Sequence, residues 1–132
     1  MKEVLDTRFF IEHFYSTDNE IKRKTVKKLK ELIQRKEGLI PAIVISETII
    51  TVCEKVGKDE AEICYENIVN GGLQIKGLSH EIAKHAGLLK CQYRNISMGD
   101  CIIAATAIEN HARILSDDPH FDIIKVAKRA WI

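Results

Sequence analysis

The stretch Ser97-Met98-Gly99-Asp100-Cys101-Ile102-Ile103-Ala104-Ala105-Thr106-Ala107-Ile108-Glu109-Asn110 decides the fold that we expect for this chain. Only Thr106 is polar between Cys101 and Ile108, so a helix here is apolar on every side and is predicted to be buried. Ser97 is typical of a helix N-cap, which places Asp100 in the first turn. The sequence therefore predicts a central helix whose N-terminus carries an acidic side chain at the boundary between the core and solvent.

A short strand and an acidic turn are expected after the central helix. Asn110 and His111 end the helix, and Arg113-Ile114-Leu115 has the pattern of a short strand. The segment Ser116-Asp117-Asp118-Pro119-His120-Phe121 then ends this strand with two more carboxylates. Acidic residues are thus expected both at the start of a buried helix and at the end of a strand.

Length and composition indicate one domain that spans residues 1–132. The hydrophobic share of 45% and the charged share of 30% are ordinary for a soluble protein. No apolar run approaches the roughly 18 residues of a membrane span, and no signal peptide precedes the first strand, so we expect a cytoplasmic location and no membrane contact. The four cysteines stand at least ten residues apart, which excludes zinc-knuckle spacing and indicates reduced thiols (Cys53, Cys64, Cys91 and Cys101).

The remaining periodicity predicts an α/β domain with a mostly parallel sheet flanked by helices, because strands alternate with one or two helices. Strands are expected at residues 2–5, 39–43, 73–76, 113–115 and 123–126. Helices are expected from residue 7 and over residues 21–36, 46–56, 59–70, 79–93 and 97–110. Gly38 is expected to end the second helix, and Pro41 weakens the second strand because it cannot donate a ladder hydrogen bond.

Acidic residues follow several of the predicted strands. In parallel sheets ligands bind outside the carboxyl ends of the strands. Asp6 follows the first strand, Glu47 lies in the opening turn expected for the helix after the second, and Asp117 and Asp118 follow the strand after the central helix. Asp100 joins them if the mouth of the central helix opens on the same edge.

Each acid also has a simple structural explanation. Asp100 can cap its helix, Glu47 can match a helix dipole, and Ser116-Asp117-Asp118-Pro119 can be a turn. These explanations do not account for the convergence of the acids on one edge, where their charges would repel. A divalent cation would compensate, and we favour Mg²⁺ or Mn²⁺ over zinc because no His or Cys shares the positions of the motifs. Such an ion suits phosphoryl chemistry with an activated water.

The chain resembles the PIN-domain family, and especially the small VapC-type toxins, along nearly its whole length. Four motifs carry this resemblance in the right order: Leu5-Asp6-Thr7, Glu47, Gly99-Asp100-Cys101-Ile102-Ile103-Ala104-Ala105-Thr106-Ala107 and Ser116-Asp117-Asp118-Pro119-His120-Phe121. The resemblance implies an endoribonuclease dependent on Mg²⁺ or Mn²⁺, with Asp6, Glu47, Asp100 and Asp118 as catalytic, metal-binding carboxylates. It also implies a small antitoxin that occupies the acidic cleft, and a homodimer.

Three neighbours of the motif acids have open roles. Thr7 can hold a metal ligand in place or bond the backbone at a strand end. Arg8 stands where the family usually has a small polar residue, and can contact the scissile phosphate, pair with an acid or point away. Asp117 stands where a basic or neutral residue is commoner and can be an additional charge only. Of the five histidines, only His120 lies beside the acids and merits a test.

Residues 22–36 form a strongly basic helix surface. Lys22, Arg23, Lys27 and Lys30 can bind RNA phosphates through a sequence-independent electrostatic term, although a solvated face is the commoner meaning of such a run. Trp131 is expected to pack in the protein rather than stack on a base.

Three other functions compete with the toxin hypothesis. A phosphoacceptor receiver domain would need an aspartate after the third strand, where the sequence has Gly77-Leu78-Ser79 instead. A non-catalytic PIN-like module that binds RNA or protein differs from the enzyme only in activity. An RNA-processing PIN nuclease would differ by the absence of a neighbouring antitoxin reading frame.

Overall fold

The computed structural model describes all 132 residues as an α/β domain. Its strands are β1 (Glu3–Leu5), β2 (Gly38–Pro41), β3 (Gln74–Lys76), β4 (Arg113–Leu115) and β5 (Arg129–Ala130). Its helices are α1 (Thr7–Tyr15), α2 (Asn19–Arg35), α3 (Ala42–Val56), α4 (Lys58–Val69), α5 (His80–Gln92), α6 (Met98–Glu109) and the short 3₁₀ helix η1 (Pro119–Ile123). The predicted α/β class is confirmed.

The five strands form one sheet in the order β3-β2-β1-β4-β5, and every pair is parallel. β1 lies in the middle, where Val4 pairs with Leu39 of β2 on one side and with Ile114 of β4 on the other. The chain thus leaves β1 toward β2 and β3 and later returns to its other side for β4 and β5. The strand order reverses between β1 and β4, which is where ligands bind in open α/β sheets.

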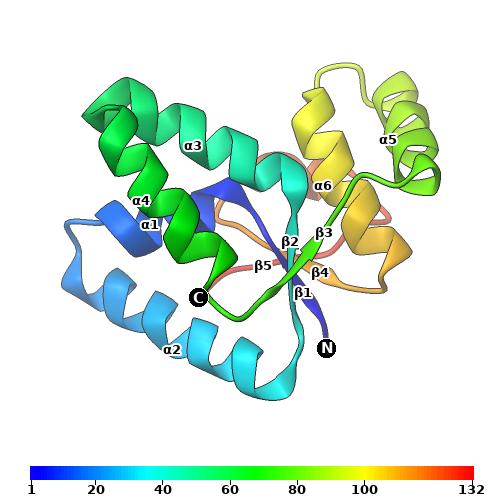
Figure 1. Ribbon diagram of the computed structural model, residues 1–132. Helices are drawn as coiled ribbons and strands as arrows, with labels where there is room; N and C mark the ends of the chain where they lie inside the picture. Colours follow the sequence, from blue (N-terminus) through cyan, green and yellow to red (C-terminus); the bar gives the residue numbers. More distant parts are fainter.

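Helix α6 is the buried central helix that the sequence predicts. Its residues from Ile103 to Ala107 are all buried, together with Cys101, because no face of the helix is polar. The Ser97 hydroxyl accepts a hydrogen bond of 3.1 Å from the backbone N–H of Asp100, which is the predicted cap. Figure 1 shows α6 packed beside α5, on the side of the strands opposite α1 to α4.

The predicted boundary between the second strand and its helix is wrong. β2 ends at Pro41, and α3 begins at Ala42 rather than at Ser46. Proline at the end of a strand needs no ladder donor, and its fixed φ suits the residue before a first helical turn. Glu47 consequently lies in the second turn of α3 rather than in the opening turn, so the expected interaction with the helix dipole does not explain its position.

Gly38 does not end the second helix as predicted. Lys36 ends it in the left-handed conformation with φ of 55°, and Gly38 is the first residue of β2. A Cβ atom at Gly38 would lie 2.6 Å from a methyl carbon of Leu73 and 3.2 Å from Cβ of Leu32, so β2 packs closely on both residues at this position.

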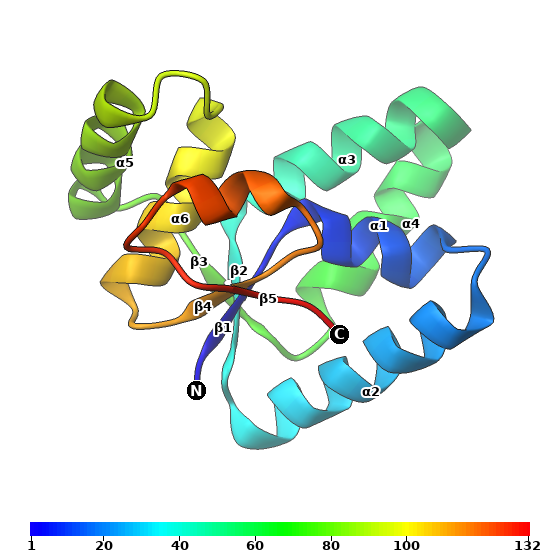
Figure 2. The same ribbon diagram turned by 180° about the vertical axis from the view of Figure 1, so that it is seen from behind.

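The last strand is also displaced from its predicted position. Residues 119–123 form η1, because the Asp118 carboxylate caps this turn by accepting the backbone N–H of His120 at 2.9 Å, and Pro119 fits the first position. Pairing with β4 resumes only at Arg129 and Ala130. Figure 2 shows this segment folding over the carboxyl ends of the strands before β5 returns along the sheet.

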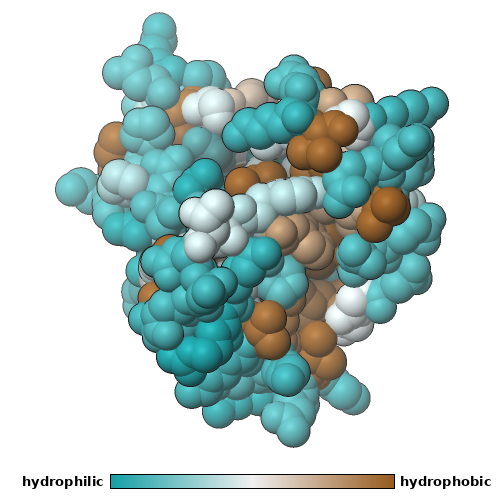
Figure 3. Space-filling view, turned by 90° about the vertical axis from the view of Figure 1, so that its left-hand side faces the viewer, coloured by the Kyte–Doolittle hydropathy of each residue, from teal (hydrophilic) through white to brown (hydrophobic).

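An apolar groove of about 260 Å³ opens between α2 and α4. Phe10, Phe14, Leu29, Ile68 and Leu73 line it together with polar residues. Figure 3 shows hydrophobic side chains gathered in a hollow between hydrophilic surfaces on this side of the molecule. None of the helices combines the length and the apolar character needed to cross a membrane.

Candidate active site

The first and last motif acids meet at the point where the strand order reverses. Asp6 directly follows β1, and Ser116 directly follows β4, its neighbour in the sheet. The wholly buried Ser116 hydroxyl donates to Asp6 Oδ2 at 2.6 Å and accepts the backbone N–H of Asp118 at 3.0 Å. One hydroxyl therefore fixes the Asp6 carboxylate and the backbone of Asp118 relative to each other.

Ser116 is a residue of the candidate site that the sequence reasoning missed. Its place directly before two aspartates at a strand end was visible, but a serine in a turn ordinarily bonds its own backbone. The partner carboxylate lies 110 residues away in the chain, and no local pattern indicates this pairing.

Glu47 reaches the site from the second turn of α3 and is held there by two residues. Thr7, the first residue of α1, donates its hydroxyl to Glu47 Oε1 at 2.8 Å. Gly99 leaves room for the other oxygen, since a Cβ atom at this position would lie 2.7 Å from Glu47 Oε2. The hydroxyl of Thr7 therefore positions an acidic side chain, which was one of the two roles considered for it.

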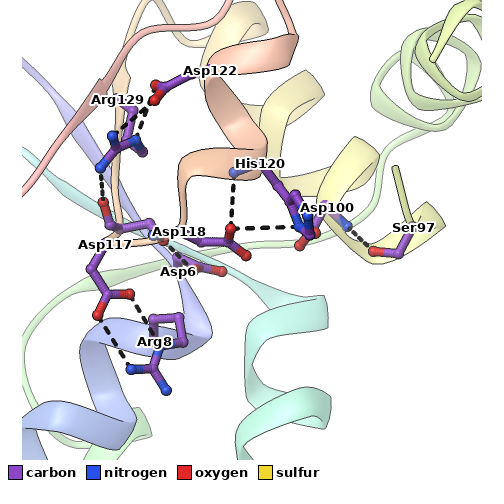
Figure 4. Close-up of polar contacts among 10 residues, drawn as sticks. Asp6, Arg8, Ser97, Asp100, Asp117, Asp118, His120, Asp122 and Arg129 are labelled. Atoms are coloured by element: carbon purple, nitrogen blue, oxygen red, sulfur yellow. Dashed lines mark hydrogen bonds and ion pairs between the residues drawn. The ribbon is translucent and has the colours of Figure 1, made fainter. Parts of the chain in front are cut away.

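The third and fourth motif acids lie together at the mouth of α6. Asp100 and Asp118, with His120, can each offer one ligand atom such that these atoms lie within 4.8 Å of one another. His120 Nδ1 lies 3.5 Å from Asp118 Oδ1, and Figure 4 shows the three side chains converging beside Asp6. His120 is the histidine that the sequence places beside the acids, and its imidazole lies within 4.8 Å of two of them.

Burial and mutual repulsion disfavour ionisation of three of the acids. Burial raises the pKa of Asp6 from 3.8 to about 6, with the charge of Asp100 adding to the effect and the hydrogen bond from Ser116 opposing it. Burial also raises the pKa of Glu47, against the hydrogen bond from Thr7. The pKa of Asp100 is raised by burial and then by the charges of Glu47 and Asp118. Each of the four acids is thus electrostatically coupled to another of the set.

These residues fit a divalent cation. The donors are carboxylate oxygens from four different elements, which is the hard-oxygen set that Mg²⁺ and Mn²⁺ prefer. Burial and, to a smaller extent, mutual repulsion raise the three pKa values, and a cation would offset both by stabilising the charged carboxylates. Two donor hydroxyls, on Thr7 and Ser116, orient Glu47 and Asp6 as the outer partners of metal ligands commonly do.

Arg8 and Asp117 pair with each other beside this cluster. Arg8 Nε lies 3.0 Å from Asp117 Oδ1, and Arg8 Nη2 lies 3.2 Å from Asp117 Oδ2 and 3.0 Å from Glu12 Oε1. Of the three alternatives for Arg8, the structure therefore shows pairing with acids. Asp117 is not an unpaired extra charge.

The basic residues of α2 lie outside the acidic site. Lys27 and Lys30 are exposed, Lys22 is half-buried, and Arg23 pairs with Glu20 of its own helix. Figures 1 and 2 show α2 toward the amino ends of the strands, away from the turn between β1 and α1. Trp131 packs edge to face on Phe9 with ring centres 6.3 Å apart, as predicted.

The fold and the site define a class of protein: a parallel α/β domain with a carboxylate cluster at the reversal of its strand order. The family model for the PIN domain matches residues 4–127. The chain therefore belongs to the PIN-domain family, which confirms the resemblance seen in the motifs. No curated protein sequence matches the chain.

Several solved structures share this fold at low sequence identity. The chain matches VapBC2 from Rickettsia felis, bound to a fragment of promoter DNA, at 19% identity and a TM-score of 0.81, over 99% of this chain and 98% of that one. DNA-bound VapBC from Salmonella typhimurium matches at 15% identity and a TM-score of 0.79, over 99% of this chain and 98% of that one. Mycobacterium tuberculosis VapC20, a toxin that cleaves the sarcin-ricin loop, matches at 15% identity and a TM-score of 0.71, over 94% of this chain and 95% of that one. These similarities show a shared fold.

Proposed function

We propose that the protein is an endoribonuclease dependent on Mg²⁺ or Mn²⁺ and acts as the toxin of a toxin–antitoxin pair. The observation that carries this proposal is the convergence of Asp6, Glu47, Asp100 and Asp118 at one edge of the sheet, with raised pKa values at the first three. Membership of the PIN-domain family and the fold shared with VapC toxins support it.

Each residue has a distinct role in the proposed reaction. Asp6, Glu47, Asp100 and Asp118 would hold the ion, which when bound supplies a nucleophilic water at neutral pH and a positive charge beside the scissile phosphate. Ser116 and Thr7 hold two of the acids in position, so little reorganisation is needed as the substrate binds. His120 is exposed and lies beside Asp118 at the edge of the site.

RNA contacts by Lys22, Arg23, Lys27 and Lys30 form part of the proposal. Because these residues lie away from the acids, they would bind phosphates beyond the cleaved bond and add to affinity without affecting the cleavage site. Lys27→Gln should then weaken RNA binding about equally for different sequences and reduce the salt slope of the affinity by about one charge. An unchanged salt slope would assign this surface to solvent.

A small antitoxin and a second copy of the chain are the proposed partners, with a cytoplasmic location for the assembly. The solved relatives from Rickettsia felis and Salmonella typhimurium are VapBC complexes, which supports a protein partner. Co-purification with the small protein encoded by a neighbouring reading frame, and loss of RNA cleavage in that complex, would test the antitoxin. Light scattering of the isolated chain would test the homodimer.

Cleavage of a panel of single-stranded and structured RNAs tests the activity. We expect cleavage with Mg²⁺ or Mn²⁺, and its loss both with EDTA and in Asp100→Asn. Asp59→Asn makes the same chemical change at an exposed position in the first turn of α4 and should cleave normally. Equal activity of Asp100→Asn and the wild type would refute the assignment of the acids as the active site.

A further inference from the structure

We propose that Arg8 is a positioning residue for the metal site, and that it acts by holding Asp117 and thereby the loop that carries Asp118. This inference rests on the proposed function, because it concerns the same four acids. The structure shows that the two side chains are each other's partners.

The contact between Arg8 and Asp117 fixes the orientation of both side chains. Two nitrogens of one planar guanidinium meet the two oxygens of one carboxylate, at 3.0 and 3.2 Å. This two-bonded arrangement is more restrictive than a contact between point charges. Glu12, one turn further along α1, accepts a third bond from the same guanidinium at 3.0 Å. Arg8 is therefore anchored on its own helix while it holds Asp117.

Asp117 lies between Ser116 and Asp118, two residues of the site. Ser116, before it, is wholly buried, bonds Asp6, and has its carbonyl oxygen held by Arg129 Nη1 at 3.1 Å. Asp118, after it, is the fourth motif acid. Figure 4 shows Arg8 and Arg129 on opposite sides of this loop. Loss of the Arg8 contact would free the Asp117 side chain and leave the loop held by Ser116, by Arg129 and by the cap that Asp118 makes to the N–H of His120. With one restraint fewer, the Asp118 carboxylate would sample more orientations.

Positioning and simple charge predict opposite results for Arg8→Ala. If Arg8 acted through its charge alone, Arg8→Ala would strengthen cation binding, since it adds net negative charge beside the acids, and Asp117→Ala would weaken it. If the pair positions Asp118, either single substitution weakens cation binding. The double variant is then no worse than the singles, because the same contact is lost in all three.

The test is calorimetric titration of Mn²⁺ into the full chain without RNA. We expect Arg8→Ala and Asp117→Ala each to weaken Mn²⁺ binding by about three- to tenfold. Losing a direct outer partner of a metal ligand typically costs about tenfold or more, and Arg8 acts one contact further out, through Asp117. The double variant should lie within about twofold of the singles, on the argument of non-additivity. Arg8→Asp/Asp117→Arg should regain most of the affinity, and Arg35→Ala, which removes one positive charge at the far end of α2, should bind as the wild type does.

The outcomes separate this inference from the proposed function. Unchanged affinity in both single variants, or changes of opposite sign, would overturn the positioning role while Mn²⁺ binding by the wild type upheld the metal site. No Mn²⁺ binding by the wild type would overturn the metal site and the positioning role together. Thermal unfolding of each variant shows whether it is folded, and Asp117→Asn, which keeps the shape of the side chain, replaces an alanine variant that does not fold.

Discussion

Replacing Asp6 by asparagine should make the metal-free protein more stable at neutral pH. Asp6 is 4% exposed, and burial raises its pKa from 3.8 to about 6. An acid whose pKa is raised on folding holds its proton more tightly in the folded state, so its contribution to stability is lost as the pH rises from about 4 through 6. The difference between the two pKa values corresponds to about 3 kcal/mol.

Asparagine has nearly the same shape and carries no charge at any pH in this range. The Ser116 hydroxyl, which lies 2.6 Å from Asp6 Oδ2, can donate to the amide oxygen instead. We therefore expect Asp6→Asn to match the wild type in unfolding free energy near pH 4. Above pH 7 the variant should exceed the wild type by up to about 3 kcal/mol.

Urea denaturation in EDTA at several pH values between 4 and 8 measures this difference. Asp59→Asn, at an exposed position, is the matched control and should show no growing difference with pH. Saturating Mn²⁺ should stabilise the wild type and not Asp6→Asn, because ligand binding to the folded state raises its stability. A variant that is less stable than the wild type at pH 7.5, or equally stable, would refute the argument that burial destabilises the ionised form of Asp6.

Three further substitutions test how the acids are held. Gly99→Ala would place a Cβ atom 2.7 Å from Glu47 Oε2, and the end of the flexible Glu47 side chain can move away. We therefore expect the free energy of unfolding to stay within about 0.5 kcal/mol of the wild type. The Mn²⁺ affinity measured by calorimetry should fall about tenfold, because Glu47 leaves its position in the site. Thr7→Val removes a hydrogen bond that lowers the pKa of Glu47, so Mn²⁺ binding should require a higher pH, and Thr7→Ser should restore the wild-type pH dependence. Ser116→Ala leaves buried polar groups unpaired and should cost about 1–3 kcal/mol in urea denaturation with EDTA, and a smaller loss would contradict its bridging role.

Three of the four acids could be placed from the sequence because each stands close to the end or the start of an element, whereas Glu47 lies further inside α3 than predicted. Asp6 follows β1, Asp118 caps η1 after β4, and Asp100 lies in the first turn of α6. Local signals locate such positions, and parallel strands then bring them to one edge without further information. The prediction for α6 held for a similar reason, since a run that is apolar on every side can only be buried.

The errors arose where tertiary contacts outweigh local pattern. Ile123 and Ile124 are β-branched and were assigned to a strand, yet the cap supplied by Asp118 begins a 3₁₀ turn that ends at Ile123. β5 has only two residues, and Arg129 is fixed there by Asp122 at 2.9 Å as well as by pairing with β4. A strand of this length has no periodicity that a sequence could display.

Ion pairs between residues more than one hundred positions apart could not be predicted from the sequence either. Arg8 and Asp117 are separated by 109 positions, and each could be described alone only as a departure from the family pattern. The sequence left pairing with an acid as one of three roles for Arg8, but it offered no means of choosing the partner. Only the adjacency of β1 and β4 makes the two residues neighbours.

The raised pKa values alone would fit either metal ligands or proton donors, and the hydrogen bonds distinguish the two roles. A group kept as a proton donor would be stabilised in its neutral form, whereas Thr7 and Ser116 both donate to carboxylate oxygens and so favour the ionised form of Glu47 and Asp6. Thr7 occupies Oε1 of Glu47, while Oε2 faces Gly99 at the mouth of α6, where Asp100 also lies. These hydrogen bonds oppose the cost of burial and repulsion but do not overcome it, because the pKa values of Asp6, Glu47 and Asp100 remain raised. A bound cation would supply the remaining stabilisation of the charged forms.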